Sequence, residues 1–304
     1  MTTASKDQVA SVDGTGRVSP VVVNHNSGWL WQACMESARH QVEELLIVDN
    51  ASGDSSLAEC EARFAKERKI RFIKNAANLG FAAACNIGLA HSKGKLVLFL
   101  NPDSQLDEGA VEHLCKAIAG DPAVGMVGGL LVNPDGSEQG GGRRAIPTPW
   151  RSFVRAFGLY RLQYRWPRIF YDFYLHKLPL PEEAVEVESI SGACMMVKRE
   201  AVSDVGEWDD NYFLHCEDLD WCMRFRAGGW KILFVPSARV VHMLGACSRA
   251  RPIFVEWHKH KGMLRFYRKF FRHQYPYGLM GLVAVGVWVR FAMVASFKMV
   301  HRKQ

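Results

Sequence analysis

Short apolar runs alternate with stretches of helical periodicity between residues 19 and 240. The runs are rich in β-branched residues and nearly continuous, which is typical of strands that a sheet buries on both faces. The runs expected to form strands are 20–24, 45–49, 70–73, 96–100 and 124–132. The stretches expected to form helices are 28–42, 54–68, 80–92 and 107–119. This order predicts an α/β fold with a mostly parallel central sheet flanked by helices.

Polar residues collect where the first four of these strands end. The segments concerned read VVVNHNSG, IVDNASGDSS, NLGFAAACNIG and LFLNPDS. In sheets of this kind, ligands bind beyond the carboxyl ends of the strands. Each segment alone is compatible with an ordinary capped turn. Four such segments in succession favour a binding site at this edge of the sheet.

Individual residues in these segments suggest contacts to a nucleotide. Asp49 could accept the imino N–H of a pyrimidine while Asn50 orders the turn, although a simple Asx-turn cap explains Asp49 equally well. Gly80 lets the backbone approach a ligand closely. Asn78 and Asn86 are plausible hydrogen-bonding partners for a ribose or a base.

A divalent cation suits Asp103, which follows the fourth strand in the segment NPDS (101–104). Mg²⁺ and Mn²⁺ prefer oxygen ligands and keep substrate phosphates in their coordination shell, although a Pro-Asp turn is the simpler explanation. His242 follows another apolar run and could complete a metal site with Asp103. Residues 188–200 are expected to form a strand, in which Gly192 offers a bare wall for a sugar.

Three carboxylates stand inside an apolar and aromatic run, FLHCEDLDWCMRF (213–225). Buried without partners they would repel one another, so they imply a cation, a proton or solvent. A helix beginning near Glu217 places Glu217, Asp220 and Trp221 on one face and Asp218 on another. One carboxylate can then face a site, while the other two stabilise the N-terminus of the helix, where negative charge is favourable. Three solvated capping residues are the alternative, which the apolar neighbours oppose.

The C-terminal part of the chain is both basic and apolar. From residue 249 onwards there are 12 Lys and Arg against one acidic residue, whereas the rest has 26 against 30. Such a tail meets an anionic partner, either nucleic acid or a membrane surface. Residues 277–297 are apolar except for Arg290 and Ser296 and could span a bilayer, which favours the membrane. A spanning helix, an in-plane helix with Arg290 snorkelling and a buried core helix all stay open.

Other protein classes are poorly supported. No GxGxxG follows the first strand, which disfavours a dinucleotide-dependent oxidoreductase, and residues 88–96 carry Leu where a P-loop needs Ser or Thr. The eight cysteines are scattered without a CxxC pair, which indicates reduced, buried thiols. Residues 143–168 interleave Arg with aromatic residues and could form a lid or a second membrane-facing patch; single-stranded nucleic acid is the less favoured partner.

Seven motifs occur here in the order seen in the inverting glycosyltransferases of family 2. They are the four strand-end segments, SGACMMVKRE, FLHCEDLDWCMRFRAGGW and the spaced residues His242, Gly245 and Ser248. Residues 18–250 therefore resemble this family, and in particular its bacterial rhamnosyltransferase-like branch. The resemblance implies a GT-A fold, a nucleotide-diphospho-sugar donor and Mg²⁺ or Mn²⁺ as cofactor. The family's DxD motif reads Asn101-Pro102-Asp103 here, so its first carboxylate is missing and His242 gains importance.

The resemblance also implies roles for individual residues. Asp218 would be the catalytic base, and Asp103 and His242 would hold the metal. The residues that would contact the donor are Asn24, Asp49, Asn50, Asn78, Gly80, Asn86, Asn101, Asp103 and Gly192. The residues that would contact the acceptor are Glu217, Asp220 and Trp221.

Together these expectations describe an inverting glycosyltransferase that moves L-rhamnose from dTDP-rhamnose to a saccharide or lipid-linked acceptor in cell-surface polysaccharide biosynthesis. Transfer of galactofuranose or of a hexose from a UDP donor is one alternative, and a non-catalytic sugar-nucleotide-binding protein is another. The expected division is a disordered tail (1–17), a GT-A domain (18–250) and membrane-associating helices (251–304). The expected location is the cytoplasmic face of the inner membrane, and nucleic acid is not an expected partner.

Overall fold

The computed structural model describes residues 17–245 and 251–301. The expected disordered tail (1–17) therefore lies almost entirely outside the described residues. The elements follow one another in this order: β1 (Val18–Asn24), α1 (Trp31–Arg39), β2 (Leu45–Asp49), α2 (Ser56–Arg63), β3 (Ile70–Lys74), α3 (Phe81–His91), β4 (Leu96–Leu100), β5 (Ser104–Leu106), α4 (Ala110–Ala119), β6 (Val124–Val132), β7 (Arg143–Arg144), α5 (Pro149–Ala156), the 3₁₀ helix η1 (Leu159–Tyr164), β8 (Val185–Glu186), β9 (Ser189–Ile190), β10 (Cys194–Lys198), α6 (Arg199–Val205), α7 (Glu217–Ala227), β11 (Lys231–His242), α8 (Pro252–Phe271) and α9 (Tyr277–His301).

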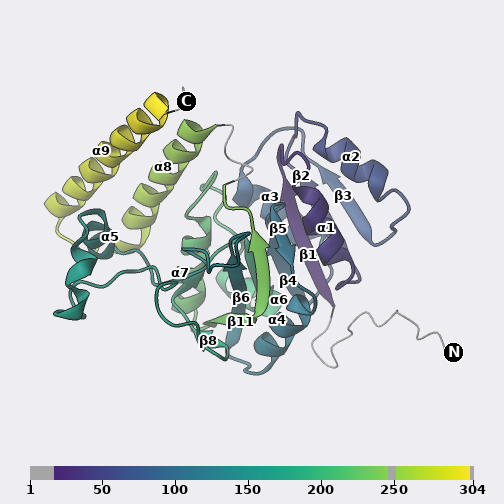
Figure 1. Cartoon of the computed structure of the whole chain (residues 1–304), viewed down its shortest axis with the longest axis horizontal. Coiled ribbons are helices and arrows are strands. Elements are labelled where there is room, and N and C mark those ends of the chain that lie inside the picture. Colours follow the sequence, from purple (N-terminus) through teal and green to yellow (C-terminus); the bar gives the residue numbers. More distant parts are fainter. Residues whose placement is uncertain (1–16, 246–250, 302–304) are drawn as a thin grey trace.

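One large sheet organises the body of the molecule (Figure 1). Its strands lie in the order β3-β2-β1-β4-β10-β6-β11-β5, and β8 pairs with β11. β3, β2, β1 and β4 are parallel to one another, and so are β6 and β11. β10 runs antiparallel between β4 and β6, and β5 and β8 are antiparallel to β11. The expected mostly parallel sheet is confirmed, with β10 as an antiparallel insertion.

Two apolar layers cover the sheet, one on each face. Cys34 of α1, Cys60 of α2 and Leu114 of α4 pack in one buried cluster. Cys85 of α3 and Trp221 of α7 belong to the other. The strands between the layers are buried along their whole length, as in β2, β4 and β6, which is why their sequences read as continuous apolar runs. The seven cysteines that the structure describes are all buried, as expected.

The expected helices are shorter in the structure than their apolar periodicity suggested. Residues 28–42 contain only α1 (Trp31–Arg39), and residues 107–119 only α4 (Ala110–Ala119). Gly28 and Gly109, which precede α1 and α4, adopt φ values of +57° and +75°. The chain therefore makes a turn at these glycines before each helix begins. The expected strand at 188–200 divides into β9 and β10, with Gly192 in the connection between them.

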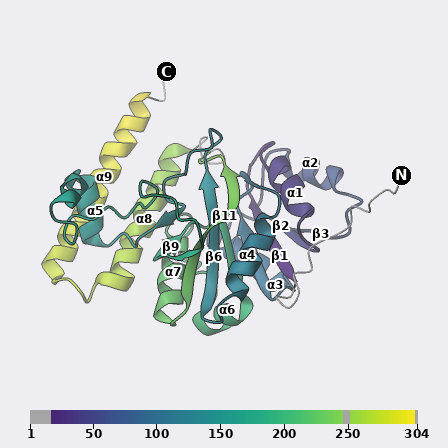
Figure 2. The same cartoon turned by 60° about the horizontal axis from the view of Figure 1, so that its bottom comes forward.

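α8 and α9 form an antiparallel helical pair at one end of the sheet (Figures 1 and 2). The Trp257 and Trp288 rings pack with centroids 4.9 Å apart. Arg290 Nη1 donates to His260 Nε2 at 2.8 Å, so this arginine is bound to α8. The spanning helix and the in-plane helix with Arg290 snorkelling both stay predictions. Lys298 forms an ion pair of 2.8 Å with Glu256. These contacts fix one side of α9 on α8.

The other side of α9 is open. Residues 278–301 have a mean hydropathy of 1.9 and only 6% of their most apolar window is buried, so the alternative of a buried core helix is wrong. The large apolar side chains that α9 exposes are Leu279, Leu282, Val285, Val289, Met293, Phe297, Met299 and Val300. By length and composition, α9 is the one helix among the described residues that could cross a membrane.

The segment after β7 supplies a second exposed aromatic surface. Trp150, Phe153 and Phe157 of the α5 region are 42%, 45% and 68% exposed. α5 is tied to α8 because Tyr267 donates its hydroxyl to Ser152 Oγ at 2.6 Å. In both ribbon views α5 lies beside α8 and α9 (Figures 1 and 2).

Candidate active site

The ends of β1 and β2 are joined by a buried hydrogen-bond network. Asn24 and Asp49 are partners in the parallel register, and Asn24 Nδ2 donates to Asp49 Oδ1 at 2.8 Å. Asp49 also accepts from the Ser52 hydroxyl at 2.6 Å and from the Ser52 backbone N–H at 3.0 Å. Asp49 therefore caps its own turn, as the simpler interpretation held. Its Oδ2 retains acceptor capacity beyond the Ser52 N–H, so a nucleobase contact is still chemically available.

Asn50 is a structural residue rather than a donor contact. Its amide nitrogen donates to Asn78 Oδ1 at 2.9 Å and to the Gly80 carbonyl at 3.1 Å. Its amide oxygen accepts from Asn75 Nδ2 at 3.1 Å and from the Leu79 N–H at 3.0 Å. Because both amide protons and both lone pairs are used within the chain, the expectation that the Asn50 side chain contacts the donor is wrong.

Asn78 and Gly80 shape the loop ahead of α3. Asn78 Oδ1 accepts from Asn50 and from the Gly80 N–H, whereas no hydrogen bond within the described chain involves Asn78 Nδ2. Gly80 adopts a φ of +90°, and a Cβ there would stand 2.7 Å from the Phe213 carbonyl oxygen. The loop can approach the 213 segment this closely only because residue 80 is glycine.

Asn86 is also occupied by the protein itself. Its Nδ2 donates to the Trp208 carbonyl at 2.9 Å and its Oδ1 accepts from the Trp208 N–H at 3.0 Å. These two bonds clamp the segment before α7 onto α3. Asn86 therefore has a positioning role, and its second amide proton and second lone pair stay available for the expected donor contact.

Asp103 and His242 meet at the paired strands β5 and β11. His242 lies opposite Ser104 in the antiparallel register, and the Met243 N–H donates to the Asp103 carbonyl at 3.0 Å. The His242 Nε2 atom is 3.2 Å from Asp103 Oδ1, and the two side chains are 6% and 5% exposed. Asn101 Nδ2 lies 3.4 Å from the same nitrogen. The two residues expected to hold the metal and the expected donor residue Asn101 are thus neighbours.

Gln139, which the sequence did not single out, fixes the state of His242. Gln139 Nε2 donates to the His242 carbonyl at 3.1 Å, so the amide orientation is set and Oε1 faces His242 Nδ1 at 2.6 Å. His242 Nδ1 must then carry the proton, which leaves the Nε2 lone pair facing the Asp103 carboxylate. A metal ion could lie between these two acceptors, and the Asn101 amide nitrogen is a hydrogen-bond donor within reach of the same Nε2 atom.

This donor set fits a divalent ion that takes its other ligands from a substrate. One carboxylate oxygen and one imidazole nitrogen, with the Asn101 amide alongside, suit Mg²⁺ or Mn²⁺. Across residues 17–245 and 251–301 no group of three or more His, Cys, Asp and Glu side chains could hold a metal. An all-protein cage is therefore absent from this part of the chain, and a bound diphosphate would have to complete the shell.

The first turn of α7 presents Asp218 to the same region. α7 begins at Glu217, as expected, and Asp218 pairs with Arg144 Nη2 of β7. The Gly192 N–H lies 3.5 Å from Asp218 Oδ2, and Asp218 Oδ1 accepts from the Leu219 N–H at 2.8 Å. Gly192 therefore lies directly beside Asp218, the expected base.

Glu217 is buried next to Asp218 and is largely unpaired. It is 7% exposed, and its Oε2 atom has no hydrogen-bond partner among the described residues. Burial, and then the negative charge of Asp218, raise the pKa of Glu217 to about 8. Glu217 is therefore largely protonated near neutral pH, and the three carboxylates are not three solvated capping residues.

Asp220 and Trp221 belong to the core and not to an acceptor site. Both are 0% exposed. Asp220 forms ion pairs of 2.8 Å with Arg224 and 2.7 Å with Lys269. The Trp221 ring packs 4.2 Å from that of Trp208. Because neither side chain presents atoms at the surface, the expectation that they contact the acceptor is wrong.

Backbone contacts join these parts into one site. The Phe81 N–H donates to the Phe213 carbonyl at 2.8 Å, which links the Gly80 loop to the segment that leads into α7. The Asn101 N–H donates to the Ala193 carbonyl at 3.1 Å, which links the metal-type residues to the Gly192 turn. The ends of β1, β2, β4 and β11 and the start of α7 thus line one continuous edge of the sheet.

The sequence analysis missed two residues of this site. Arg144 is one of seven arginines in a segment without acidic residues, and no pattern marks it as the partner of Asp218. Gln139 lies in a glycine-rich stretch, 103 positions from His242. Both contacts depend on the long connection between β6 and β10, whose path local patterns do not specify.

Comparison with known proteins agrees with this geometry. The sequence model described as "Glycosyl transferase family 2" matches residues 19–206. The chain belongs to glycosyl transferase family 2. The family resemblance noted from the motifs is thereby confirmed, and the matched region contains β1 to β10 with the polar strand ends.

Relatives within and beyond the family support the same assignment. The chain is 30% identical over 222 residues to an N-acetylglucosaminyl-diphospho-decaprenol L-rhamnosyltransferase of Mycobacterium tuberculosis, covering 69% of each chain. Its fold is similar to that of GalNAc-T7 in complex with UDP, GalNAc and Mn²⁺ (TM-score 0.56, 18% identity, 76% of this chain and 44% of that one). It is also similar to a mannosyltransferase of Pyrobaculum calidifontis in complex with GDP-Man and Mn²⁺ (TM-score 0.56, 17% identity, 84% and 64%). This family 2 glycosyltransferase therefore has a GT-A-like fold and is a homologue of a rhamnosyltransferase.

Proposed function

We propose that this glycosyltransferase transfers L-rhamnose, with inversion, from dTDP-rhamnose to a lipid-linked saccharide during cell-surface polysaccharide biosynthesis. The similarity that carries the proposal is the 30% identity to the mycobacterial L-rhamnosyltransferase, which extends over 69% of both chains. The name of that relative describes an acceptor on a decaprenyl diphosphate. An apolar helix able to meet a membrane is consistent with an acceptor of this kind.

Asp218 is the proposed catalytic base. It is the carboxylate of the α7 turn that reaches the edge of the sheet, whereas Asp220 is locked in ion pairs and Glu217 is protonated near neutrality. Inversion needs one in-line displacement at the anomeric carbon, with a carboxylate taking the proton of the attacking hydroxyl. Arg144 pairs with Asp218 Oδ2 and so holds the carboxylate in one orientation, in which Oδ1 accepts from the Leu219 backbone N–H.

Asp103 and His242 are the proposed residues for holding a divalent cation, with Asn101 alongside. The crystallised neighbours named above contain Mn²⁺, and Mg²⁺ would find the same ligands. The ion would neutralise charge on the diphosphate of the donor. The proposed lining of the donor site is Asp49, Asn78, Gly80, Asn86 and Gly192, and Asn78 Nδ2 is a free donor group among the described residues. The expected donor contact of Asn24 is wrong for the same reason as that of Asn50, because its buried amide is used on Asp49 and on serine hydroxyls.

The proposed division of labour separates the body from the tail. Residues 18–250 form the catalytic domain, and residues 251–304 associate with the cytoplasmic face of the membrane. The apolar side of α9 that faces away from α8 is the contact surface in this proposal. The ribbon of α5 lies beside that of α9 (Figure 2), and α5 has the exposed residues Trp150 and Phe153, of the kind found at the interface between lipid and water.

The test is Asp218→Asn in the full-length enzyme, with dTDP-rhamnose and a lipid-linked acceptor. Because the amide keeps the shape and removes the basicity, kcat should fall by roughly 10²–10⁴-fold while the donor Kd changes little. Asp204→Asn, an exposed residue at the end of α6, is the matched control and should turn over normally. Near-normal turnover of Asp218→Asn would show that the base lies elsewhere. If a donor screen shows that the enzyme consumes a UDP-sugar and not dTDP-rhamnose, the proposed donor is wrong.

A further inference from the structure

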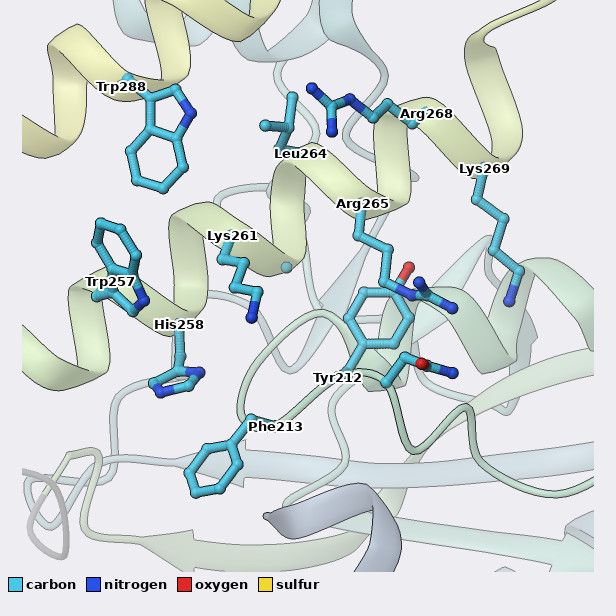
Figure 3. A pocket seen from close by; sticks show the side chains of 12 residues that line it. Tyr212, Phe213, Trp257, His258, Lys261, Leu264, Arg265, Arg268, Lys269 and Trp288 are labelled. Atoms are coloured by element: carbon cyan, nitrogen blue, oxygen red, sulfur yellow. The ribbon is translucent and has the colours of Figure 1, made fainter. Parts of the chain in front are cut away.

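A pocket of about 670 Å³ lies outside the donor edge, between α8, α9 and the segment that precedes α7. Its size falls in the usual range for small-molecule sites. Figure 3 shows Lys261 pointing into the open space, with Trp257 and Trp288 to one side and Arg265 and Lys269 to the other. No side chain that lines the pocket carries a carboxylate. The lining is thus basic on one flank and aromatic on the other.

Two of the cations in this pocket have no compensating charge. Arg265 and Lys269 both form ion pairs with Asp209, at 2.9 Å and 2.7 Å. Lys261 and Arg268 are exposed, and no carboxylate of the described chain lies within 4.0 Å of either. Unpaired cations grouped in a concave site are a binding feature for an anion with several oxygens, such as a diphosphate.

The aromatic flank suits an apolar hydrocarbon chain of a ligand better than a second charged group. Trp257 is 45% exposed and packs on Trp288 of α9. Val285 and Val289, which precede and follow Trp288 on α9, are 59% and 52% exposed. The aromatic flank of the pocket therefore continues into the exposed apolar side of α9, the helix proposed to meet the membrane. A free nucleotide or inorganic phosphate would leave this apolar flank without a partner.

The pocket also shares a loop with the proposed base. Phe213 lines the pocket, and its carbonyl accepts from the Phe81 N–H beside the donor loop. Asp218 follows five residues later, at the start of α7. Gly262 of α8 lets this loop pass close by, since a Cβ there would stand 2.7 Å from the His215 carbonyl oxygen. A ligand anchored by its diphosphate in the pocket would therefore carry its sugar along the loop that leads to Asp218.

We propose that this pocket binds the diphosphate of a polyprenyl-diphosphate acceptor, with Lys261 and Arg268 on the phosphates and the first isoprene units against Trp257 and Trp288. The proposal rests on the proposed function only in taking the acceptor to be lipid linked. It assigns the acceptor site to α8 and α9, away from Asp220 and Trp221. The donor site at the ends of β1 and β2 is separate.

The experiment measures binding of farnesyl diphosphate to the full chain by calorimetry in detergent, with EDTA present so that the Asp103–His242 pair holds no metal. Lys261→Glu/Arg268→Glu should weaken this binding by about 10- to 100-fold, because two charge-assisted contacts are lost. The matched control is Lys66→Glu/Arg68→Glu, which makes the same charge change at exposed residues before β3. The control should bind farnesyl diphosphate normally, and both variants should retain dTDP binding when Mn²⁺ is added. Lys261→Ala is the milder variant, with an expected loss of about tenfold.

Other ligands separate the competing explanations. Inorganic diphosphate and farnesol should each bind much more weakly than farnesyl diphosphate, and Trp257→Ala should weaken only the lipid-bearing ligand. Inorganic diphosphate that binds as tightly as farnesyl diphosphate would overturn the lipid assignment. A double variant that loses as much affinity for phosphatidylglycerol vesicles as for farnesyl diphosphate would overturn it as well. Unchanged farnesyl diphosphate binding in the double variant would overturn the site itself. If dTDP-rhamnose is not consumed but farnesyl diphosphate binding depends on Lys261, the proposed donor fails and the pocket stands.

Discussion

Replacing Glu217 by Gln should stabilise the enzyme, and increasingly so as pH rises. Glu217 is 7% exposed, its Oε2 atom lacks a partner, and burial raises its pKa from 4.5 to about 8. Between these two pH values the folded chain keeps a proton that the unfolded chain has lost. The free energy of unfolding must therefore fall with rising pH in this window, by about 1.4 kcal/mol per pH unit. Below pH 4.5 the group is protonated in both states and the penalty vanishes.

The size of the effect follows from the width of that window. Between pH 5 and pH 7 the wild-type enzyme should lose about 2.5 kcal/mol through Glu217 alone. The Glu217→Gln variant has no titrating group at this position, so the difference in free energy of unfolding between variant and wild type should grow by the same amount. Any fixed cost of burying the extra amide N–H groups shifts this difference by a constant and leaves its slope with pH unchanged.

Urea unfolding followed by tryptophan fluorescence, in detergent at pH 5, 6, 7 and 8.5, measures this slope. Glu200→Gln is the control, because Glu200 is exposed in the first turn of α6, and its difference from wild type should not vary with pH in this range. A Glu217→Gln difference that stays constant from pH 5 to pH 8.5 would refute the reasoning. It would mean that Glu217 ionises in the folded enzyme as it does in water.

Two further outcomes are expected. His242→Ala should weaken Mn²⁺-dependent binding of dTDP by roughly tenfold or more while thymidine binding persists, because only the diphosphate depends on the metal; equal losses for both ligands in calorimetry would indicate a structural histidine. Removing residues 277–304 should transfer the enzyme from the membrane pellet to the supernatant, because the exposed apolar side of α9 is lost. High salt should release little full-length protein, since apolar burial is not screened, and a truncated chain that still sediments with membranes would contradict this surface.

Local patterns were sufficient wherever burial alone determines the structure. The strands β2, β4 and β6 are buried throughout and could be predicted from their apolar runs. The polar ends of these strands lie along one edge because parallel strands end together. The meeting of Asp103 and His242 followed from the same rule, although 139 residues separate them. The antiparallel direction of β10 did not follow, because an apolar run has no direction.

Side-chain roles were harder to predict than side-chain positions. Asn50 follows β2 at the expected edge, but its amide is used within the chain. Asn86 lies in α3 and holds the Trp208 backbone. An asparagine at a strand end looks the same in sequence whether it binds a ligand or a loop. Trp221 looked like a stacking surface for a sugar and instead lies 0% exposed between Trp208 and Phe225. Only the packing of α7 on the sheet distinguishes these outcomes.

The turn before α7 concentrates more unfavourable features than any stabilising role would require. His215 and Cys216 both adopt left-handed φ values, +69° and +72°, without being glycine. Within the part of the chain that the structure describes, the next residue, Glu217, has a buried oxygen without a partner, and Arg144, which pairs with Asp218, has a buried Nε without one. A fold that needed only to cap α7 could place Ser or Thr there and avoid all of these costs. In the proposed function the turn retains them because it sets Asp218, the proposed base, between Arg144, the Gly192 turn and the loop that lines the pocket proposed for the acceptor.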